Sequence, residues 1–197
     1  MIIKNMTKGE FRKQVKNLLN SSKELFPQAS EKICNQLLTL DLYKSSSIIL
    51  SYMALDDEVN LSMLMEQALK DGKKVYIPRI IPDSSQMDFY EKTALSDINI
   101  YGIQEPEKNA RKFEIRKYDD EILILTPGRA FSKNGGRLGR GKGYYDTYLA
   151  RLKEKNAGNL KVIGIAFDLQ VFNELPLEKH DEKMDYLVTE KGIIKFI

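Results

Sequence analysis

Cationic residues and glycines gather in one short stretch of this chain. Residues 128–143 contain five Lys or Arg side chains and no Asp or Glu, although the formal net charge of the 197 residues is only +3. The five cations are Arg129, Lys133, Arg137, Arg140 and Lys142. Lys and Arg bind phosphate oxygens through charge-assisted hydrogen bonds, and glycines let backbone N–H groups approach an anion closely. The stretch therefore predicts an anion-binding loop, and the alternative is an exposed glycine-rich loop without a ligand.

The spacing of glycine and lysine in this stretch is close to that of a phosphate-binding P-loop. Gly136 and the pair Gly141-Lys142 follow the G-x-x-x-x-G-K pattern, but Gly143 stands where a P-loop has the Ser or Thr that holds magnesium. The loop also begins about ten residues after the predicted strand before it, and not directly after it. These departures exclude an ordinary P-loop nucleotide hydrolase but keep the phosphate-binding role.

A carboxylate follows the glycines at the start of a predicted helix. Asp146 would lie in the first turn of a helix that begins near Tyr144. Mg²⁺ in proteins often takes one or two carboxylates and completes its coordination with phosphate oxygens and water. Asp146 could therefore supply the magnesium contact that the loop itself lacks. The alternative is a carboxylate that only complements the positive end of the helix dipole.

Acidic residues gather after a different predicted strand. Asp56, Asp57 and Glu58 follow the apolar segment 47–53, whereas the cationic stretch follows the apolar segment 121–126. Ligands of α/β proteins bind beyond the carboxyl ends of the strands. One acidic and one cationic loop could therefore face a single crevice. The alternative for the acidic residues is a solvated turn before the next helix.

Hydrophobic periodicity predicts helices alternating with strands, which is the pattern of an α/β domain with a mostly parallel sheet. A capping box at Thr7 should start a first helix whose inward residues are Phe11, Val15, Leu18 and Leu19. Further helices are expected at about 30–40, at 61–70 with Asn60 as its cap, and from Tyr144 onward. Strands are expected at 47–53, 74–77, 87–90, 121–126, 161–167, 186–189 and 193–196. Pro78 should end its strand, and 97–114 should form a loop.

Length and composition suit a single domain over residues 1–197. Hydrophobic residues make up 42% and charged residues 30%, which is a globular balance. No apolar run approaches the roughly 20 residues of a membrane span, and the first residues lack the apolar segment of a secretory signal. Cys34 is the single cysteine, so no internal disulfide can form, and with His180 it is too little for a zinc site. We expect a cytoplasmic protein with Cys34 in its core.

Several segments together resemble a known family. The most specific is Asn134-Gly135-Gly136-Arg137-Leu138-Gly139-Arg140-Gly141-Lys142-Gly143-Tyr144-Tyr145-Asp146, which follows Pro127-Gly128-x-Ala130-Phe131-Ser132. Shorter similar segments are Lys8-x-x-x-Arg12, Asp57-Glu58-Val59-Asn60, Ile77-Pro78-Arg79, Tyr101-Gly102-Ile103-x-Glu105-Pro106 and Asp185-x-x-Val188-Thr189-Glu190. With these segments the chain resembles the 5-formyltetrahydrofolate cyclo-ligase family, also called 5,10-methenyltetrahydrofolate synthetase, over nearly its whole length.

The resemblance implies a fold and a reaction. The fold is a three-layer α/β sandwich with helices on both faces of a mostly parallel, mixed sheet. The reaction converts 5-formyltetrahydrofolate and ATP to 5,10-methenyltetrahydrofolate, ADP and phosphate, and it requires Mg²⁺. The formyl oxygen attacks the γ-phosphate of ATP, and N10 of the folate then closes the ring and expels phosphate. This chemistry needs two aligned substrates and cations around the phosphoryl group, with no nucleophilic side chain.

The resemblance also assigns the nucleotide contacts. Lys8 and Arg12, four residues apart on the first predicted helix, match the N-terminal ATP contacts of the family. The remaining ATP contacts implied are Arg137, Leu138, Gly139, Arg140, Gly141, Lys142, Gly143, Tyr144 and Tyr145. Arg140 is expected to stabilise charge on the transferring phosphate, and Lys142 is the second catalytic cation. The alternative for Lys8 and Arg12 is a solvated basic helix face.

The folate and metal contacts come from the same resemblance. Glu58 matches an acidic residue that contacts the folate, and a carboxylate suits the N–H donors along the pterin edge. Other folate contacts implied are Arg140, Gly141, Lys142, Gly143 and Tyr144, and one or more of Leu50, Tyr52 and Met53. Asp146 matches the magnesium ligand. A second carboxylate should come from Asp181, with Asp185 as the alternative, and His180 should be a surface side chain.

Two other functions stay open at this point. The first is another ATP-dependent ligase or kinase that uses the same phosphate loop on a different small substrate. The second is an RNA-binding module, which the mild net charge and the acidic residues 56–58 and Asp181 disfavour. We expect a monomer whose partners are the small molecules 5-formyltetrahydrofolate and ATP, without nucleic acid or membrane.

Overall fold

The computed structural model describes residues 6–82, 84–93, 95–98, 102–115, 121–155, 159–178 and 181–196. A seven-stranded sheet in the order β12-β11-β9-β6-β1-β2-β3 forms its centre. Its strands are β1 (Ser46–Leu50), β2 (Lys74–Ile80), β3 (Met87–Glu91), β6 (Glu121–Thr126), β9 (Leu160–Ile165), β11 (Tyr186–Thr189) and β12 (Gly192–Lys195). The α-helices are α1 (Lys8–Asn20), α2 (Phe26–Thr39), α3 (Asp41–Ser45), α4 (Ser62–Lys70) and α5 (Tyr144–Glu154).

The central five strands of this sheet run parallel, and the edge strands β3 and β12 pair antiparallel with their neighbours. Residues 122–125 of β6 are all apolar and buried, which is typical of a parallel strand covered on both faces. The structure therefore confirms the predicted α/β fold with a mostly parallel, mixed sheet.

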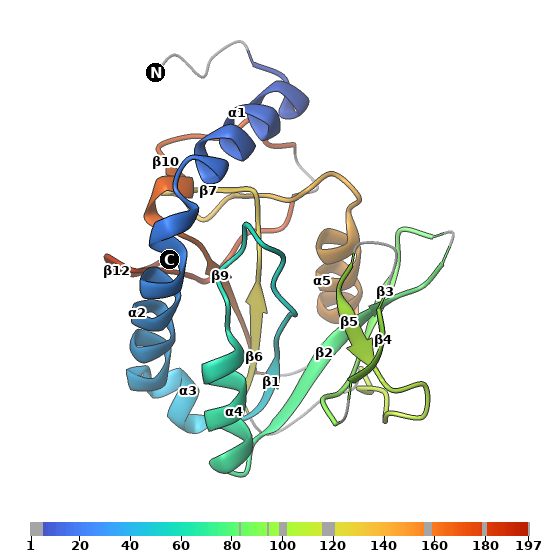
Figure 1. The fold of residues 1–197 in the computed structure, drawn as a ribbon. Coiled ribbons are helices and arrows are strands. Elements are labelled where there is room, and N and C mark those ends of the chain that lie inside the picture. The colour runs from blue at the N-terminus through green and yellow to red at the C-terminus, as the bar shows by residue number, and fades with distance from the viewer. Residues whose placement is uncertain are drawn as a thin grey trace.

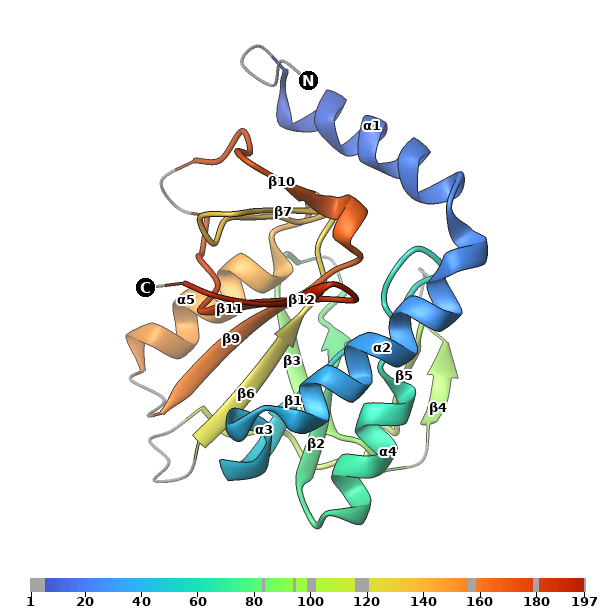
Figure 2. The ribbon, with the colours of Figure 1, turned by 90° about the vertical axis from the view of Figure 1, so that its left-hand side faces the viewer.

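Helices cover both faces of the sheet (Figures 1 and 2). On one face, Ile33 of α2 and Leu64 of α4 join Leu123 of β6 in one hydrophobic core. On the opposite face, Leu149 of α5 joins Ile122 in a second core. Neighbouring residues of β6 thus enter different cores, because successive side chains of a strand point to opposite faces. This confirms the three-layer arrangement.

The order of the strands reverses between β1 and β6. From β1 the chain continues through α4 to β2 on one side, whereas from β6 it continues through α5 to β9 on the other side. Such a switch point is where α/β sheets bind ligands, beyond the carboxyl ends of the strands. In Figure 1 the arrow of β6 points towards β7 and α1, which lie beyond this edge.

A small second sheet connects β6 to the glycine-rich loop. It consists of β7 (Ala130–Ser132), β8 (Arg137–Leu138) and β10 (Val171–Phe172), in the order β10-β7-β8. The backbone N–H of Arg129 donates to the carbonyl of Leu138 over 2.7 Å. Residues 137 and 138 therefore lie beside the segment that follows the carboxyl end of β6, although about ten residues separate them from that strand in the sequence.

The first helix forms as its sequence predicts, with one exception. Thr7 and Glu10 make both hydrogen bonds of a capping box at the start of α1. Phe11, Val15 and Leu19 are buried, but Leu18 is 41% exposed, so its predicted place in the core is wrong. Leu18 is adjacent to Leu19, and a helix turns by about 100° per residue. The buried residues of α1 lie four apart, at Phe11, Val15 and Leu19, and Leu18 lies beside this narrow stripe on its exposed side.

Some predicted boundaries shift for identifiable reasons. α2 begins at Phe26 and not near residue 30, because Pro27 lies in its first turn, where no N–H donor is needed. β1 ends at Leu50. The hydrogen bond that follows it towards β2 is donated by the N–H of Ser51 to the carbonyl of Tyr76. Asn60 lies one residue before the N-cap of α4, and its Oδ1 accepts from the N–H of Ser62 over 2.9 Å.

Pro78 does not end its strand, contrary to the sequence-based prediction. β2 continues to Ile80 by pairing with β3. The carbonyl of Tyr76 faces β1, so the nitrogen of Pro78, two residues later, faces the same side. The pairing with β1 covers only residues 74–76 of β2. Proline therefore lies where no ladder donor is required, as it does at the edge of a sheet.

The segment predicted as a loop between residues 97 and 114 contains regular structure. β4 (Leu95–Ile98) and β5 (Gln104–Pro106) form a two-stranded antiparallel sheet. Two short, charged strands leave little hydrophobic alternation, so the periodicity of the sequence does not reveal them. Within the described ranges, no helix is long and apolar enough to cross a membrane.

Candidate active site

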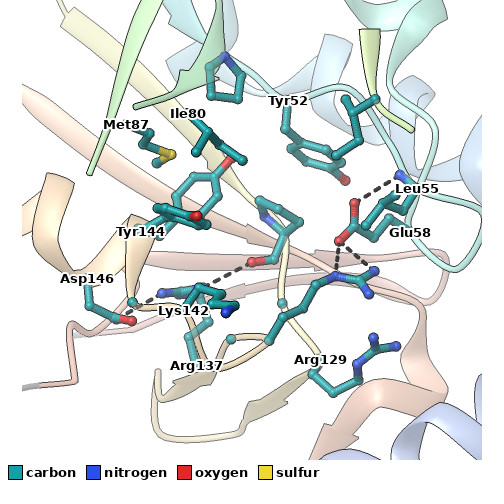
Figure 3. A pocket seen from close by; sticks show the side chains of 18 of the residues that line it. Tyr52, Leu55, Glu58, Ile80, Met87, Arg129, Arg137, Lys142, Tyr144 and Asp146 are labelled. Atoms are coloured by element: carbon teal, nitrogen blue, oxygen red, sulfur yellow. Dashed lines mark hydrogen bonds and ion pairs between the residues drawn. The ribbon is translucent and has the colours of Figure 1, made fainter. Parts of the chain in front are cut away.

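A pocket of about 440 Å³ opens at the switch point, beyond the carboxyl ends of β1 and β6. Figure 3 shows Glu58 and Tyr52 on one side of it and Lys142 and Tyr144 on the other. The residues that line it are Tyr52, Met53, Leu55, Glu58, Pro78, Ile80, Met87, Ile103, Pro127, Gly128, Arg129, Arg137, Gly139, Arg140, Lys142, Gly143, Tyr144, Tyr145 and Asp146. Both predicted loops therefore contribute to one cavity.

The acidic wall is the loop between β1 and α4. Tyr52 is buried, and its hydroxyl donates to the carbonyl of Val59 over 2.9 Å, which closes the loop on itself. One carboxylate oxygen of Glu58 accepts from the N–H of Leu55 over 3.0 Å. These bonds fix the direction in which Glu58 points, so the carboxylate reaches the pocket in a defined position.

The cationic wall is the loop that follows β8. Gly143 is the N-cap of α5 and has a φ of 73°, a left-handed conformation that favours glycine. The loop thus turns sharply into the helix and places the N-terminus of α5, the positive end of its dipole, beside the pocket. Lys142, just before this turn, lines the pocket and has no carboxylate partner within the described ranges.

Ion pairs join the two walls. The Arg140 guanidinium binds Asp57, and its Nε donates to a Glu58 carboxylate oxygen over 2.9 Å. Nη1 of Arg129 binds the other carboxylate oxygen of Asp57 over 2.5 Å. Burial disfavours the charged form of Asp57, but hydrogen bonds from Arg129 and Arg140 outweigh it and lower the pKa of this carboxyl. Asp57 therefore stays ionised between two arginines.

A second ion pair lies on the helix side of the pocket. Arg137 is 3% exposed, and its Nη2 donates to Oδ1 of Asp146 over 2.8 Å (Figure 3). Its Nη1 donates to the carbonyl of Pro127 over 3.2 Å. Its guanidinium also lies 5.4 Å from the ring centre of Tyr145. Burial raises the pKa of the Tyr145 hydroxyl, so this tyrosine stays protonated beside the pocket.

The N-terminal helix supports the glycine-rich loop from outside the pocket. Nε of Arg12 donates to the carbonyl of Gly139 over 2.8 Å. Nζ of Lys8 lies 2.8 Å from an Asp181 carboxylate oxygen and 3.4 Å from one of Glu178. Neither Lys8 nor Arg12 lines the pocket, but Arg12 touches the loop on which the predicted nucleotide contacts lie.

The predicted metal carboxylates lie in different surroundings. Asp146 lines the pocket, whereas Asp181 pairs with Lys8 outside it. Asp185 accepts from the N–H of Val162 over 2.7 Å, so its carboxylate is bound to the backbone of β9. Across the described parts of the chain, no group of three His, Cys, Asp or Glu residues is placed to hold a metal ion. Asp146 alone still fits Mg²⁺ that also binds phosphate oxygens, because Arg137 contacts one of its two oxygens.

Two predicted contact residues belong to the interior. Leu138 and Leu50 are both buried in the hydrophobic cores and do not line the pocket. Tyr52 and Met53 do line it. Cys34 is buried in the core, as predicted. Tyr101 and His180 lie outside the described residues.

A buried arginine and an apolar wall of the pocket have no signal in the sequence. Arg129 belongs to the cationic stretch 128–143, but no sequence pattern indicates that it pairs with Asp57. The apolar wall comes from several separate segments: Met53, Leu55, Pro78, Ile80, Met87 and Ile103. Single apolar residues of this kind carry no motif, and only the pairing of β2 with β3 brings Ile80 and Met87 together.

Comparison with known proteins identifies the family. Residues 4–190 match the 5-formyltetrahydrofolate cyclo-ligase family. A protein of Schizosaccharomyces pombe described as a probable 5-formyltetrahydrofolate cyclo-ligase is 35% identical, over 94% of this chain and 98% of its own length. The 5-formyltetrahydrofolate cyclo-ligase of Mus musculus is 30% identical, over 94% and 95%.

A solved structure agrees with these sequence comparisons. The NMR structure of Aquifex aeolicus 5,10-methenyltetrahydrofolate synthetase superposes with a TM-score of 0.78 and 33% identity, covering 96% of this chain and 93% of that one. Fold and sequence thus agree. The chain belongs to the 5-formyltetrahydrofolate cyclo-ligase family and is an enzyme of that class.

Proposed function

We propose that this enzyme couples ATP hydrolysis to the cyclisation of 5-formyltetrahydrofolate to 5,10-methenyltetrahydrofolate. The observation that carries the proposal is the pocket at the switch point, which has a cationic glycine-rich wall opposite an acidic and apolar wall. The first wall suits a triphosphate and the second suits a reduced pterin. Two substrates can therefore meet in one cavity, as a reaction between them requires.

The nucleotide occupies the cationic wall in this proposal. Lys142 reaches the pocket without a carboxylate partner in the described ranges, and the N-terminus of α5 adds N–H donors and the positive end of its dipole. Arg12 holds the loop through the carbonyl of Gly139. The terminal phosphates would lie against Arg140 and Lys142, where cations can stabilise the charge that shifts during phosphoryl transfer.

The folate occupies the opposite wall. Met53, Leu55, Ile80 and Met87 provide apolar surface for the flat rings. Among the described residues, Leu55 and the guanidinium of Arg140 donate to Glu58, and a carboxylate has room for further donors. The N–H groups along the pterin edge are such donors. Glu58 is therefore the residue that would orient the formyl group towards the phosphate.

The proposed reaction has two steps. The formyl oxygen attacks the γ-phosphorus and the bond to ADP breaks, which gives an imino-phosphate. N10 then attacks the formyl carbon and closes the five-membered ring, the N10 proton is lost to solvent or to the departing phosphate, and inorganic phosphate leaves as its bond to the former formyl carbon breaks. Arg140 and Lys142 neutralise the phosphoryl oxygens in both steps, and the apolar wall excludes water that would hydrolyse the activated formyl group.

Mg²⁺ would be held by Asp146 together with phosphate oxygens of the nucleotide. When bound, the ion neutralises phosphate charge and orients the terminal phosphates. The second carboxylate oxygen of Asp146 would be the metal ligand, while Arg137 keeps Oδ1 in place. Asp181 would join the ion only if it released Lys8.

The experiment that tests this proposal is a product assay. Purified protein, MgATP and 5-formyltetrahydrofolate should give the methenyl chromophore in the near ultraviolet and one ADP per product. Omission of either substrate should abolish both signals. ADP release that does not depend on 5-formyltetrahydrofolate would favour a ligase or kinase with another substrate, and the absence of product would contradict the proposal.

We also propose that the protein is a monomer that works in the cytoplasm. Its single cysteine is buried and free, which suits a reducing compartment. Size-exclusion chromatography with light scattering and cell fractionation test these two points. Elution as a dimer, or recovery from an organelle, would contradict them.

A further inference from the structure

Arg129 is a buried arginine at the edge of the active-site pocket. Its side chain is 8% exposed, and its guanidinium binds Asp57 over 2.5 Å. Its backbone is held at both ends, because its N–H donates to Leu138 and its carbonyl accepts from the buried side chain of Gln170 over 3.2 Å. The backbone of Arg129 is therefore held in place, and its guanidinium neutralises the carboxylate of Asp57.

Asp57, Glu58, Arg129 and Arg140 form one cluster of charges, and their sum is zero only when Arg129 is included. Asp57 and Glu58 carry two negative charges, and Arg140 alone would leave one of them uncompensated next to the pocket. Arg140 contacts both carboxylates at once. With Arg129 bound to Asp57, the four groups are neutral as a set. Without it, the excess negative charge would face the position where the nucleotide phosphates are expected.

Uncompensated charge in a partly buried site acts strongly on a neighbouring anion. Two unit charges a few ångströms apart interact by several kcal/mol when water screens them poorly. The four groups are one network, since Asp57 is bound to Arg129 through one oxygen and to Arg140 through the other. A change at Arg129 is therefore transmitted to Arg140 through a single carboxylate.

We propose that Arg129 is a positioning residue that neutralises Asp57 and thereby keeps the cationic field of Arg140 available to the nucleotide phosphates. This inference deepens the proposed function and rests on it for the identity of the anion. Arg129 acts through Asp57, to which its guanidinium is bound. It sets the position of Arg140 and the affinity of the pocket for a triphosphate.

The test compares variants whose effects on MgATP binding should have opposite signs. Arg129→Met leaves Asp57 uncompensated, so the Kd for MgATP should rise about tenfold. Asp57→Asn removes the negative charge, so the Kd should stay equal or fall, while kcat falls because Arg140 loses one of its two orienting partners. Arg129→Lys keeps the charge and should stay within about threefold of wild type.

Two further variants separate the electrostatic role from a structural one. The double variant Arg129→Met/Asp57→Asn removes both charges, so it should recover most of the lost affinity for MgATP, and it carries the test if Arg129→Met alone does not fold. Arg151→Met is the matched control, because Arg151 pairs with the buried Asp88 and does not line the pocket. It should lower the melting temperature and leave the Kd for MgATP unchanged.

The outcomes distinguish this inference from the proposed function. Weaker MgATP binding in both Arg129→Met and Asp57→Asn, or no recovery in the double variant, would overturn the role of Arg129. Wild-type protein that binds MgATP but forms no methenyl product would contradict the proposed reaction. The opposite changes in the Kd for MgATP in Arg129→Met and Asp57→Asn would still test the role of Arg129. Wild-type protein that does not bind MgATP would overturn both.

Discussion

Arg140 holds two carboxylates of the opposite loop at once, and this contact defines how the pocket must work. Coulombic attraction to Glu58 and Asp57 outweighs the effect of burial and raises the pKa of the Arg140 guanidinium further. Arg140 thus remains a cation at every relevant pH. The same side chain is 35% exposed, so a phosphate can reach it from the pocket.

Replacement of Arg140 by alanine should lower kcat by roughly 10²–10³-fold, the usual cost of losing one group that stabilises transition-state charge. The affinity for folate should change much less, because Glu58 keeps its bond from Leu55. Steady-state kinetics with each substrate varied in turn measures the difference. Arg140→Lys is the control and should retain part of the activity. A loss of ATP binding that equals the loss of kcat would instead make Arg140 a ground-state anchor.

Replacement of Asp146 by asparagine should raise the Mg²⁺ concentration needed for half-maximal activity by about tenfold, because one negative charge near the ion is lost. Asparagine can still accept the hydrogen bond from Arg137, so the fold should survive. A Mg²⁺ titration of activity at saturating ATP gives the result. Asp181→Asn, tested in parallel, shows whether the second carboxylate matters. An unchanged midpoint in Asp146→Asn would remove this residue from the metal site.

At the scale of elements, the turn into α5 depends on one left-handed residue. Gly143 has a φ of 73°, which costs a residue with a Cβ atom roughly 1–2 kcal/mol. Gly143→Ala should therefore lower both the melting temperature and the affinity for MgATP, since the turn carries Lys142 and the helix N-terminus. Calorimetry and nucleotide titration measure the two effects.

A glycine elsewhere provides the control for this prediction. Gly9 lies inside α1, and a Cβ atom there would meet nothing nearer than the Thr7 hydroxyl at 3.9 Å. Gly9→Ala should raise stability by about 0.5–1 kcal/mol, because alanine is the better helix former. If Gly143→Ala matched the wild-type melting temperature and nucleotide affinity, the strain at this turn would not matter.

The sequence predicts helices and strands well where a local signal is strong. It predicts them poorly where pairing with another strand determines whether a strand forms and where it ends. The capping box at Thr7, the strand 121–126 and the start of α5 at Tyr144 are confirmed, because each has a local signal. The extension of β2 beyond Pro78 depends on β3, and β4 depends on β5. Such partners are set by tertiary structure, so no local pattern could reveal them.

The stability of the whole molecule should reflect the charge network around Asp57. The folded pKa of Asp57 lies below that of the unfolded chain, so its contribution is present above about pH 4 and is lost as pH falls through the lower, folded value. Asp57→Asn should therefore cost roughly 1–3 kcal/mol at pH 7 and progressively less in acid. Denaturant unfolding of both proteins at pH 7 and at about pH 3 measures this. A difference that grows in acid would contradict the assigned pKa direction.

Ligand binding should also register in global stability. A ligand that binds only the folded state, at about 100 times its Kd, adds about 2.7 kcal/mol, and each kcal/mol raises the melting temperature by roughly 2–4 °C in a chain of this size. MgATP should therefore raise it by several degrees. ATP with EDTA in place of Mg²⁺ is the control and should give a smaller shift. Equal shifts would argue against a metal ion in the nucleotide site.

The location of the pocket could be predicted from the sequence, but its second wall could not. Acidic residues after one strand and cations after another indicate a shared crevice, and the ion pairs of Arg140 agree with that expectation. Ile80, Met87 and Ile103 reach the same cavity only because the strand order reverses between β1 and β6 and an antiparallel edge is added. The positions of these side chains are thus determined by the topology of the sheet and not by the sequence of any one segment.

The arginines of the pocket have a thermodynamic consequence for the order of events. Among the described lining residues, Arg129, Arg137 and Arg140 each hold a carboxylate in the free protein. An incoming triphosphate that engages Arg140 therefore meets a cation that Asp57 and Glu58 already partly neutralise, so association is partly an exchange of counter-charges and not a simple gain of contacts. Since added salt weakens the contacts on both sides of such an exchange, nucleotide affinity should depend only shallowly on ionic strength.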